Sequence, residues 1–432
     1  MGGGLLQLVA YGAQDVYLTG NPQITFFKVA YRRHTNFALE AIEQTFNGNP
    51  GYGQRVTCQI SRNGDLINRM YLQVKLPAGG STYYNFYGLR LLNYVEIEIG
   101  GQRIDKHYSH WLYVWNELTL PRSKRHGYNE MVGAYGANKV NNTLYIPLEF
   151  WFCRNVGLAL PLIALQYHEV KVNINFETQT KCMSGATPSS FTASLWVDYI
   201  YLDTDERRRF AQLSHEYLIE QLQFTGEEAV TSLSIKPKLN FNHPCKELIW
   251  FISNNTGNNW FNYTTSSAML PVAPSASSLT ADTNDELYGG IPTIANVSLA
   301  QTNIDYDKSG CSSNSRPANP VKSAKLVLNG NDRFAERPGR YFNLIQTYQH
   351  HENIPTNAGI NVYSFAIKPE EHQPSGTLNM SRIDTAVLNI TLQDAINTNY
   401  APLTGNYNLY VYAVNYNVLR ILSGMGGLAY SN

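Results

Sequence analysis

Apolar and polar residues alternate in many short stretches of the chain, and this spacing predicts β-strands with one buried and one solvated face. Residues 95–99 and 170–176 both show the pattern. Asn63-Gly64 lies between two further strand candidates and predicts a hairpin, because both central residues of a type I′ turn need positive φ. No stretch alternates strand and helix as parallel α/β folds do. The pattern therefore predicts an all-β chain built from antiparallel sheets.

Two stretches interrupt the alternation and predict short helices in loops. Residues 110–120 are rich in large apolar side chains and precede Pro121. Asp203 is followed three residues later by Glu206, which is typical of a helix start. We therefore interpret Asp203, Asp205 and Glu206 as capping residues rather than as a carboxylate pair for glycoside hydrolysis.

The strand landmarks of the first half of the chain return in the same order in the second half. The paired stretches are 39–48 with 217–226, 95–104 with 324–334, 168–177 with 384–393, and the strand that starts at Trp196 with 409–421. A seam near the centre of the chain, residues 196–226, separates the two series. This recurrence predicts two copies of one all-β unit.

The repeat and the seam predict how the chain is divided. An N-terminal arm covers residues 1–23, a first unit covers residues 24–212, and a second unit covers residues 213–432. The second unit contains a long insertion, about residues 253–321, that is rich in Ser, Thr, Asn, Ala, Gly and Pro. The long connections between strands favour jelly-roll sandwiches over simple meanders. We expect the insertion to be exposed, and we expect the apolar residues of the arm to pack against another surface.

The charge balance restricts the partners of the chain. Lys plus Arg and Asp plus Glu number 33 each, and only 15% of the residues are charged, whereas Tyr alone contributes 30 residues. A neutral chain is not steered toward nucleic acid or toward an anionic membrane. The short basic runs at residues 121–126 and 207–209 favour solvated or interface charge over nucleic-acid recognition. We therefore expect no sequence-specific binding of nucleic acid.

The cysteines and the apolar runs restrict the chain further. Five cysteines without a CxxC spacing argue against a disulfide framework and against a structural zinc site, so we expect buried reduced thiols. The longest apolar run, residues 158–165, is interrupted by Pro161 and is too short to span a bilayer. The N terminus has no signal-peptide pattern. We therefore expect no transmembrane segment.

Motifs that would carry a definite chemistry are absent from the sequence. There is no phosphate-binding P-loop, no HExxH zinc motif and no GxSxG nucleophile elbow. Residues 424–429, GMGGLA, fit GxGxxA but are not followed by a helix that could hold a pyrophosphate. His107 and His110 are interpreted as partly exposed structural histidines, and His350 and His351 as part of a polar loop. We predict no catalytic, cofactor-binding or metal-binding residue.

Six Asn-x-Ser/Thr sequons provide the candidate modification sites. Three of them fall in the long insertion, where a glycan could project from the surface: Asn254, Asn262 and Asn296. The other three are Asn141, Asn379 and Asn389, of which Asn389 lies in a predicted strand. We therefore expect covalent N-glycans, if present, on the insertion.

Long stretches of the chain resemble one protein family. They are residues 8–28, 98–108, 157–171, 196–204, 209–226, 382–390 and 415–430. These stretches resemble the double jelly-roll major capsid proteins of large icosahedral double-stranded DNA viruses, the nucleocytoplasmic large DNA viruses. Within that family the chain is most similar to the proteins of chlorella-infecting algal viruses, the phycodnaviruses. The insertion at 253–321 matches the family least.

The resemblance implies a structural protein without enzymatic activity or cofactor. It implies two tandem eight-stranded jelly rolls per chain, homotrimers with a pseudo-hexagonal outline, and an icosahedral shell with an internal membrane beneath it. The implied partners are neighbouring capsomers and minor capsid proteins. The implied location is the virion, after assembly in the cytoplasm of the host cell.

Two other classes of protein fit an all-β chain rich in Tyr. A carbohydrate-binding sandwich of the lectin type would use such Tyr-rich faces to stack on sugars. A glycosidase built on a β-sandwich is the third alternative. A stable trimer in solution would favour the capsid protein, and a monomer that binds glycans would favour the lectin.

Overall fold

Strands with alternating apolar residues pair into four main antiparallel sheets in the computed structural model of the chain. The structure describes residues 10, 12–15, 19–22, 34–76, 82–134, 143–184, 190–254, 260–264, 319–393 and 407–430. The chain divides into Met1–Phe37 and Ala38–Asn432, and each part is considered by itself. Most of the predicted arm, 1–23, and most of the predicted insertion, 253–321, lie outside the described residues.

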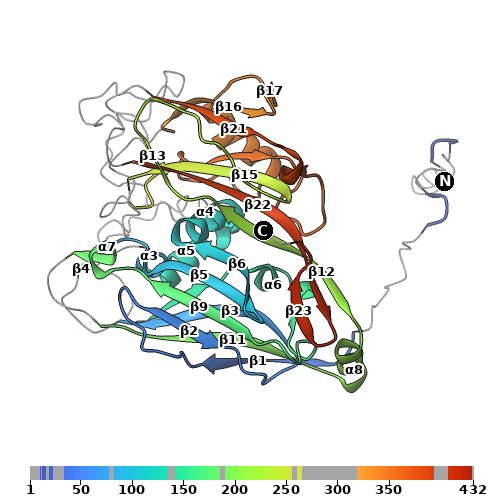
Figure 1. Cartoon of the computed structure of the whole chain (residues 1–432). Helices are drawn as coiled ribbons and strands as arrows, with labels where there is room; N and C mark the ends of the chain where they lie inside the picture. The colour runs from blue at the N-terminus through green and yellow to red at the C-terminus, as the bar shows by residue number, and fades with distance from the viewer. Residues whose placement is uncertain are drawn as a thin grey trace, which may run out of the picture. The chain divides into compact units, whose positions relative to one another are not determined.

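The first sandwich consists of two facing sheets (Figure 1). The β1 sheet has the strand order β1 (Phe37–Gln44), β11 (Thr192–Leu202), β3 (Leu66–Lys75) and β7 (Thr143–Pro147), and β8 (Leu160–Pro161) also pairs with β3. The β2 sheet has the order β2 (Arg55–Gln59), β9 (Val170–Phe176), β5 (Leu92–Ile99) and β6 (Gln102–Tyr108). β4 (Thr82–Tyr83) and β10 (Met183–Ser184) form a separate short ladder.

The second sandwich repeats this arrangement (Figure 1). The β12 sheet has the order β12 (His215–Phe224), β22 (Asn408–Leu422), β15 (Pro244–Ser253) and β19 (Asn361–Ser364). β13 (Glu228–Ala229) and β23 (Met425–Leu428) also pair with β22, and β20 (Leu378–Asn379) pairs with β15. The β14 sheet has the order β14 (Ser234–Ile235), β21 (Ala386–Leu392), β16 (Val321–Leu328) and β17 (Asn331–Asp332), and β18 (Arg337–Pro338) pairs with β16.

Both sandwiches have the same topology. We number the eight main described strands of each sandwich from 1 to 8 in chain order and leave out the short additional strands. In both sandwiches, one sheet then has the strand order 1-8-3-6 and the other has the order 2-7-4-5. This is the strand arrangement of a jelly roll. The predicted all-β double jelly roll is therefore confirmed.

The predicted landmark pairs occupy equivalent places in the two sandwiches. β1 and β12 are the first strands, β9 and β21 the seventh, and β11 and β22 the eighth. The remaining pair forms the hairpin between the fourth and fifth strands. It turns at Gly100 and Gly101 in the first sandwich and at Asn329 and Gly330 in the second, all with positive φ. A two-residue turn with positive φ at both positions matches the twist of the flanking strands, so both halves use the same device.

The hairpin predicted at Asn63-Gly64 is wrong. β2 pairs with β9 and β3 pairs with β11, so the segment between β2 and β3 crosses from one sheet to the other. Gly64 is needed for a different reason: a Cβ atom there would lie 3.0 Å from the Cβ of Tyr199. The dipeptide is typical of a turn, but here its small glycine permits close packing against the opposite strand.

Short helices lie in the connections between strands. They are α3 (Tyr87–Leu91), α4 (Ser109–Thr119), α5 (Arg122–Val132), α6 (Trp151–Arg154), α7 (Gln179–Cys182), α8 (Thr204–Gln212), α9 (Gln346–His350), the 3₁₀ turns η1 (Val156–Leu158) and η5 (Met380–Arg382), and the π-type turn η4 (Tyr341–Ile345). α4 confirms the helix predicted at 110–120. α8 confirms the predicted start, because the Asp203 side chain caps it by accepting a hydrogen bond from the backbone N–H of Thr204 at 2.7 Å. None of the described helices is long and apolar enough to cross a membrane.

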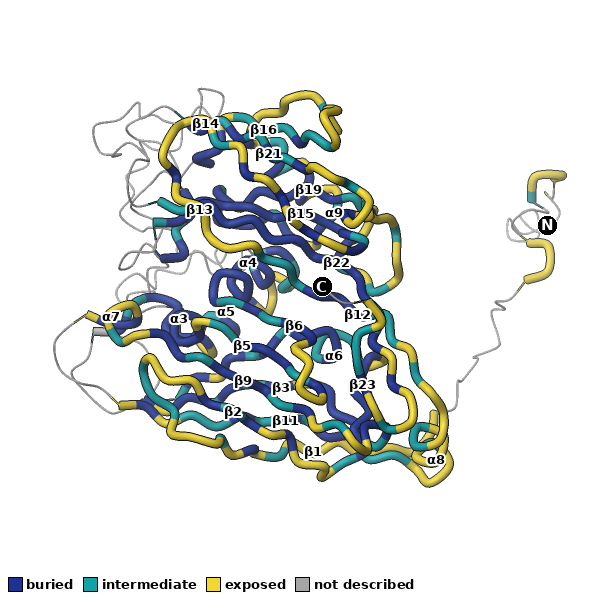
Figure 2. Tube along the Cα trace, in the orientation of Figure 1, coloured by how far each residue is buried: buried dark blue, intermediate teal, exposed yellow. Residues whose placement is uncertain are grey.

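The central strands of the β12 sheet, β15 and β22, are buried on both faces. Figure 2 shows β15 and β22 in the buried class along most of their length. One face packs on the interior of the second sandwich, and the other packs toward the first sandwich. Strands buried on both faces carry continuous rather than alternating apolar runs, as these two do. The β12 sheet therefore joins the two sandwiches.

Candidate assembly surfaces and the junction that supports them

The junction between the sandwiches is built from aromatic side chains. α4 follows β6 and lays His110 and Trp111 on the outer face of the β12 sheet. The ring of His110 lies 4.7 Å from that of Tyr410, and the ring of Trp111 lies 5.7 Å from that of Tyr412. Tyr410 in turn stacks on Phe251 of the neighbouring strand, at 5.2 Å and 13°. These contacts make the apolar core of the first sandwich continuous with the β12 sheet.

Buried charges cross the same junction. Glu220 of β12 accepts hydrogen bonds from Lys246 Nζ at 2.7 Å and from an Arg154 guanidinium nitrogen at 3.2 Å. Lys246 has no exposed side-chain surface, and Glu220 exposes only 8%. Arg154 also lies over the ring of Trp115, 4.0 Å from its centroid. The Glu220 carboxylate is thus paired with one cation from each sandwich, and removal of either cation would leave a buried charge without one of its partners.

A second carboxylate ties β6 to β12. Asp105 accepts a hydrogen bond from the backbone N–H of Leu222 at 3.0 Å, and its other oxygen lies 2.9 Å from Nε2 of His107. His107 and His110 are 1% and 5% exposed, so the prediction of structural histidines holds but the predicted exposure is wrong. His110 is part of α4, which the second sandwich covers, and His107 lies in β6 just before it, so both belong to the packed junction.

His351 is buried between two carboxylates, where a polar loop was predicted. Its Nε2 lies 2.8 Å from Glu247 and its Nδ1 lies 2.8 Å from Glu370. Burial by itself lowers the pKa of His351, but the two carboxylates outweigh burial and raise the pKa from 6.5 to about 9. The correction has a simple cause: Glu247 is 104 positions away in the sequence, so no local pattern near His351 shows the ion pair.

Replacement of His351 should therefore change how stability depends on pH. The raised pKa means that the protonated His351 stabilises the fold fully below pH 6.5, and that this contribution is lost as the pH rises through about 9. Chemical denaturation at pH 6 should show His351→Gln destabilised by about 3 kcal/mol, with most of the difference gone at pH 10. His126→Gln, at a side chain that is 62% exposed, should follow the wild-type curve. Parallel curves for wild type and His351→Gln would contradict the assignment.

The C-terminal strand β23 fastens the second sandwich to the first. The backbone N–H of Tyr167 donates to Gly424 O at 2.9 Å, and the N–H of Leu428 donates to Oε1 of Gln102 at 3.1 Å. A Cβ atom at Gly426 would lie 2.6 Å from Leu165. The glycines of the GMGGLA stretch are therefore explained by a tight hairpin that packs closely on the neighbouring sandwich.

The outer face of the β1 sheet carries a row of aromatic side chains. Trp196 and Tyr71 are directly opposed on neighbouring strands, with ring centroids 6.2 Å apart and planes 1° apart. The ring of Tyr145, on the next strand, lies 6.0 Å from that of Tyr71. Tyr145 is 39% exposed, and Leu39 on the edge strand is 60% exposed. Aromatic rings on an accessible sheet face are typical of protein interfaces, which are enriched in Tyr and Trp.

A second exposed apolar group lies on the second sandwich. Ile345 at the end of η4 is 47% exposed, and Tyr348 of α9 is 76% exposed. Ile367 is 69% exposed, and its carbonyl oxygen lies 2.9 Å from Nδ1 of His350. That contact holds Ile367 beside α9. We call Ile345, Tyr348 and Ile367 the α9 patch.

The candidate glycosylation sites lie partly within the described residues. Asn254 follows β15 and is half-buried, as is Asn262, whereas Asn296 lies outside the described residues. Asn262 Oδ1 accepts hydrogen bonds from the backbone N–H and the hydroxyl of Thr264, at 3.1 and 2.7 Å. The hydroxyl of Ser253 donates to Trp260 O at 2.9 Å, which closes the base of the loop between the two sequons.

The cysteines, the possible metal ligands and the basic run at α8 show no sign of a chemical site within the described residues. Among the described cysteines, Cys58, Cys153, Cys182 and Cys245 are free, and burial raises the pKa of each; Cys311 lies outside the described residues. No group of three or more His, Cys, Asp or Glu side chains within the described ranges could hold a metal ion. In the basic run at α8, Arg207 pairs with Asp65 at 2.9 Å and Arg209 with Glu206 at 3.3 Å. Both arginines thus form ion pairs within the chain.

Comparison with known proteins agrees with the fold over the whole chain. Residues 25–203 match the model of the major capsid protein N-terminus, and residues 206–427 match that of the large eukaryotic DNA virus major capsid protein. The chain is 52% identical to the major capsid protein of Pyramimonas orientalis virus and 47% identical to that of Paramecium bursaria Chlorella virus 1, with each pair covering 100% of both chains.

Solved structures give the same assignment. The crystal structure of PBCV-1 VP54 superposes with a TM-score of 0.76 at 42% identity, over 94% of this chain and 100% of that one. The Faustovirus major capsid protein superposes with a TM-score of 0.68 at 13% identity, over 95% and 94% of the two chains, which shows a shared fold. The chain is a virion component without enzymatic activity, and it belongs to the family of major capsid proteins of large eukaryotic DNA viruses.

Proposed function

We propose that the chain forms homotrimeric capsomers with a pseudo-hexagonal outline that tile an icosahedral shell. The observation that supports this is the identical strand order of the two sandwiches in one chain. Three chains then present six similar units, so an object with threefold symmetry can occupy hexagonal positions in a lattice. The junction supports the proposal too, because its aromatic core and buried ion pairs hold the two sandwiches as one rigid block.

The finer division of the chain is part of this proposal. Residues 24–212 and 213–432 form the two jelly rolls, and residues 1–23 form an arm that contacts neighbouring capsomers or minor capsid proteins. Assembly takes place in the host cytoplasm, with a viral membrane beneath the shell. Removing residues 2–22 should leave soluble trimers while impairing their incorporation into virions.

The glycan proposal concerns Asn254, Asn262 and Asn296 on the insertion. Its support is the length and composition of that segment and, at Asn262, the hydrogen bond between the amide and the Thr264 hydroxyl. Peptide mass spectrometry of intact virions should find sugars on these asparagines. Bare asparagines at all three, with sugars elsewhere, would contradict the proposal.

Light scattering coupled to size-exclusion chromatography tests the trimer. The purified chain should elute as one species with three times the chain mass of 48.7 kDa. A monomer at all concentrations would contradict the proposal. A monomer that also binds a glycan array would favour the carbohydrate-binding alternative.

A further inference from the structure

The junction inside one chain has two parts that recur elsewhere in the same chain. Its first part is an aromatic pair on the third and eighth strands of the second sandwich, Phe251 and Tyr410, which are opposed in register and stacked. Its second part is α4, which follows the fifth strand of the first sandwich and covers that pair. The junction is thus a helix of one sandwich on the outer sheet face of the other.

The first sandwich carries the equivalent aromatic pair. Tyr71 and Trp196 also lie on the third and eighth strands, are also opposed in register, and are also stacked. Tyr145 on the sixth strand extends the row and is 39% exposed. The face that is covered in one sandwich is therefore accessible in the other.

The second sandwich carries the equivalent of α4. After its fifth strand, β17, the chain forms η4 and α9, which bear most of the α9 patch. Tyr348 is 76% exposed, an unusual position for a large aromatic ring on a short helix that otherwise closes the end of a core. Phe342 of the same segment anchors it, 5.0 Å from the ring of Trp250.

We propose that the α9 patch of one copy packs on the outer face of the β1 sheet of a second copy, and so repeats the intrachain junction between chains. The inference rests on the proposed trimer and names its contact surfaces. Each copy has one patch and one face at different places, so the contact is head-to-tail, and three copies close a ring. The ring has six similar junctions, which alternate within and between chains.

The chemistry of the two surfaces favours a second copy of this chain as the partner. The apolar surfaces of Tyr71, Trp196 and Tyr145 match an apolar patch of comparable type, and aromatic residues dominate the affinity of protein interfaces. The same chain supplies both surfaces, and the intrachain junction shows that this combination of helix and sheet face packs well. A single contact type then serves all six positions of the ring.

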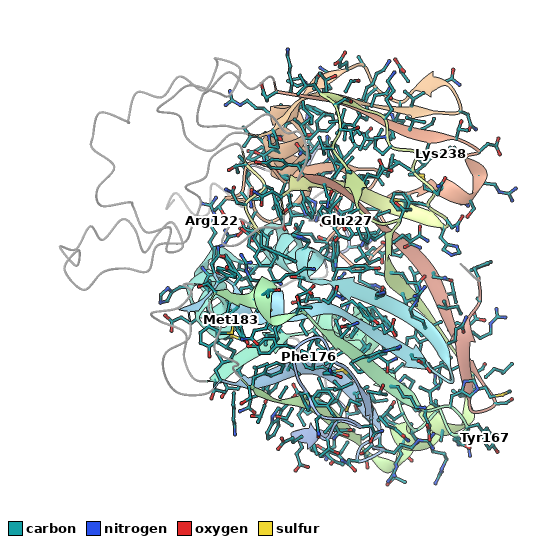
Figure 3. The ribbon with its side chains drawn as sticks, turned by 60° about the vertical axis from the view of Figure 1, so that its left-hand side comes forward. Arg122, Tyr167, Phe176, Met183, Glu227 and Lys238 are labelled. Atoms are coloured by element: carbon teal, nitrogen blue, oxygen red, sulfur yellow. The ribbon has the colours of Figure 1, made fainter. Side chains whose placement is uncertain are left out.

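Three tyrosine variants test the proposal. Tyr348→Arg removes the patch and Tyr71→Arg removes the face, and each should raise the dissociation constant of the trimer by about tenfold or more. Tyr167→Arg is the matched control: Tyr167 is 74% exposed, against 76% for Tyr348, and it belongs neither to the α9 patch nor to the β1 sheet. Figure 3 shows it at the lower right edge of the molecule, where its ring lies beside Gly424. The control variant should form trimers as the wild type does. Circular dichroism checks that all three variants fold.

A mixing experiment separates this geometry from any symmetric contact. The Tyr348→Arg chain keeps an intact face, and the Tyr71→Arg chain keeps an intact patch. At a concentration low enough for each variant alone to be monomeric, a mixture should therefore form a heterodimer through one intact junction without closing a ring.

The possible outcomes are distinct. If the wild type is trimeric and both Tyr348→Arg and Tyr71→Arg remain trimeric at all concentrations, the trimer stands and the proposed surfaces are wrong. If Tyr167→Arg weakens the trimer as much as they do, the surfaces are also wrong. If the wild type is monomeric, the proposed function fails, and the inference fails with it.

Discussion

Lys246→Met should destabilise the protein by about 3–5 kcal/mol, because it removes one partner of a buried ion pair and leaves a charge behind. Lys246 Nζ lies 2.7 Å from Glu220 Oε1 with no exposed side-chain surface. Methionine fills a similar volume, so the lost free energy of unfolding reflects the unpaired charge rather than a cavity. The measurement is the free energy of unfolding from chemical denaturation followed by circular dichroism.

The chain contains a matched control for this experiment. Lys368 and Glu371 are also 2.7 Å apart, but their side chains are 63% and 55% exposed. Lys368→Met should cost far less than Lys246→Met, since solvent screens an exposed pair. Adding Glu220→Gln to Lys246→Met should recover part of the loss, because the amide can still accept a hydrogen bond from Arg154. Equal losses at Lys246 and Lys368 would show that burial of the pair contributes nothing.

Trp111→Ala should cost about 3–5 kcal/mol and should weaken the coupling between the sandwiches. Trp111 is 1% exposed, and its ring contacts Tyr412 across the junction. Its indole nitrogen has no hydrogen-bond partner among the described residues, so the loss comes from lost apolar packing and the cavity rather than from a broken hydrogen bond. Calorimetry should show the variant unfolding in two transitions, one for each sandwich, where the wild type unfolds in one.

Trp196→Ala is the control for Trp111→Ala. Trp196 lies on the outer face of the β1 sheet and is half-buried, so its removal creates no closed cavity. Trp196→Ala should lower the free energy of unfolding by less than Trp111→Ala does. The Trp196→Ala variant should still unfold in a single transition. A single transition for both variants, with similar losses, would mean that the junction does not couple the sandwiches.

The strands that alternate in sequence were predictable because only one of their faces is covered. β5 and β9 lie where residues 95–99 and 170–176 predict them, and Asp203 caps the helix that it was expected to cap. The repeat was also predictable, since equivalent strands keep their order along the chain. These features depend on neighbours in the sequence.

The junction was not predictable from such patterns, because its partners are far apart in the chain. Glu220 meets Arg154 and Lys246 through the fold, and His351 meets Glu247 in the same way. One signal was present in the sequence: Lys246 and Glu247 lie within an otherwise apolar strand. Charged residues are almost never fully buried unless they are paired, so their place in β15 indicates buried partners.

The joining of the sandwiches by β22 affects how the protein folds while the ribosome is making it. α4 leaves the ribosome with the rest of the first sandwich, but Tyr410 and Tyr412, which cover it, are synthesised only with the eighth strand of the second sandwich. Domains generally fold in the order of their synthesis. Until β22 is synthesised, the first sandwich therefore exposes the apolar face of α4. During that interval, nascent chains on neighbouring ribosomes are prone to aggregate. We therefore expect the yield of folded protein to depend on how well this surface is shielded until β22 has been synthesised.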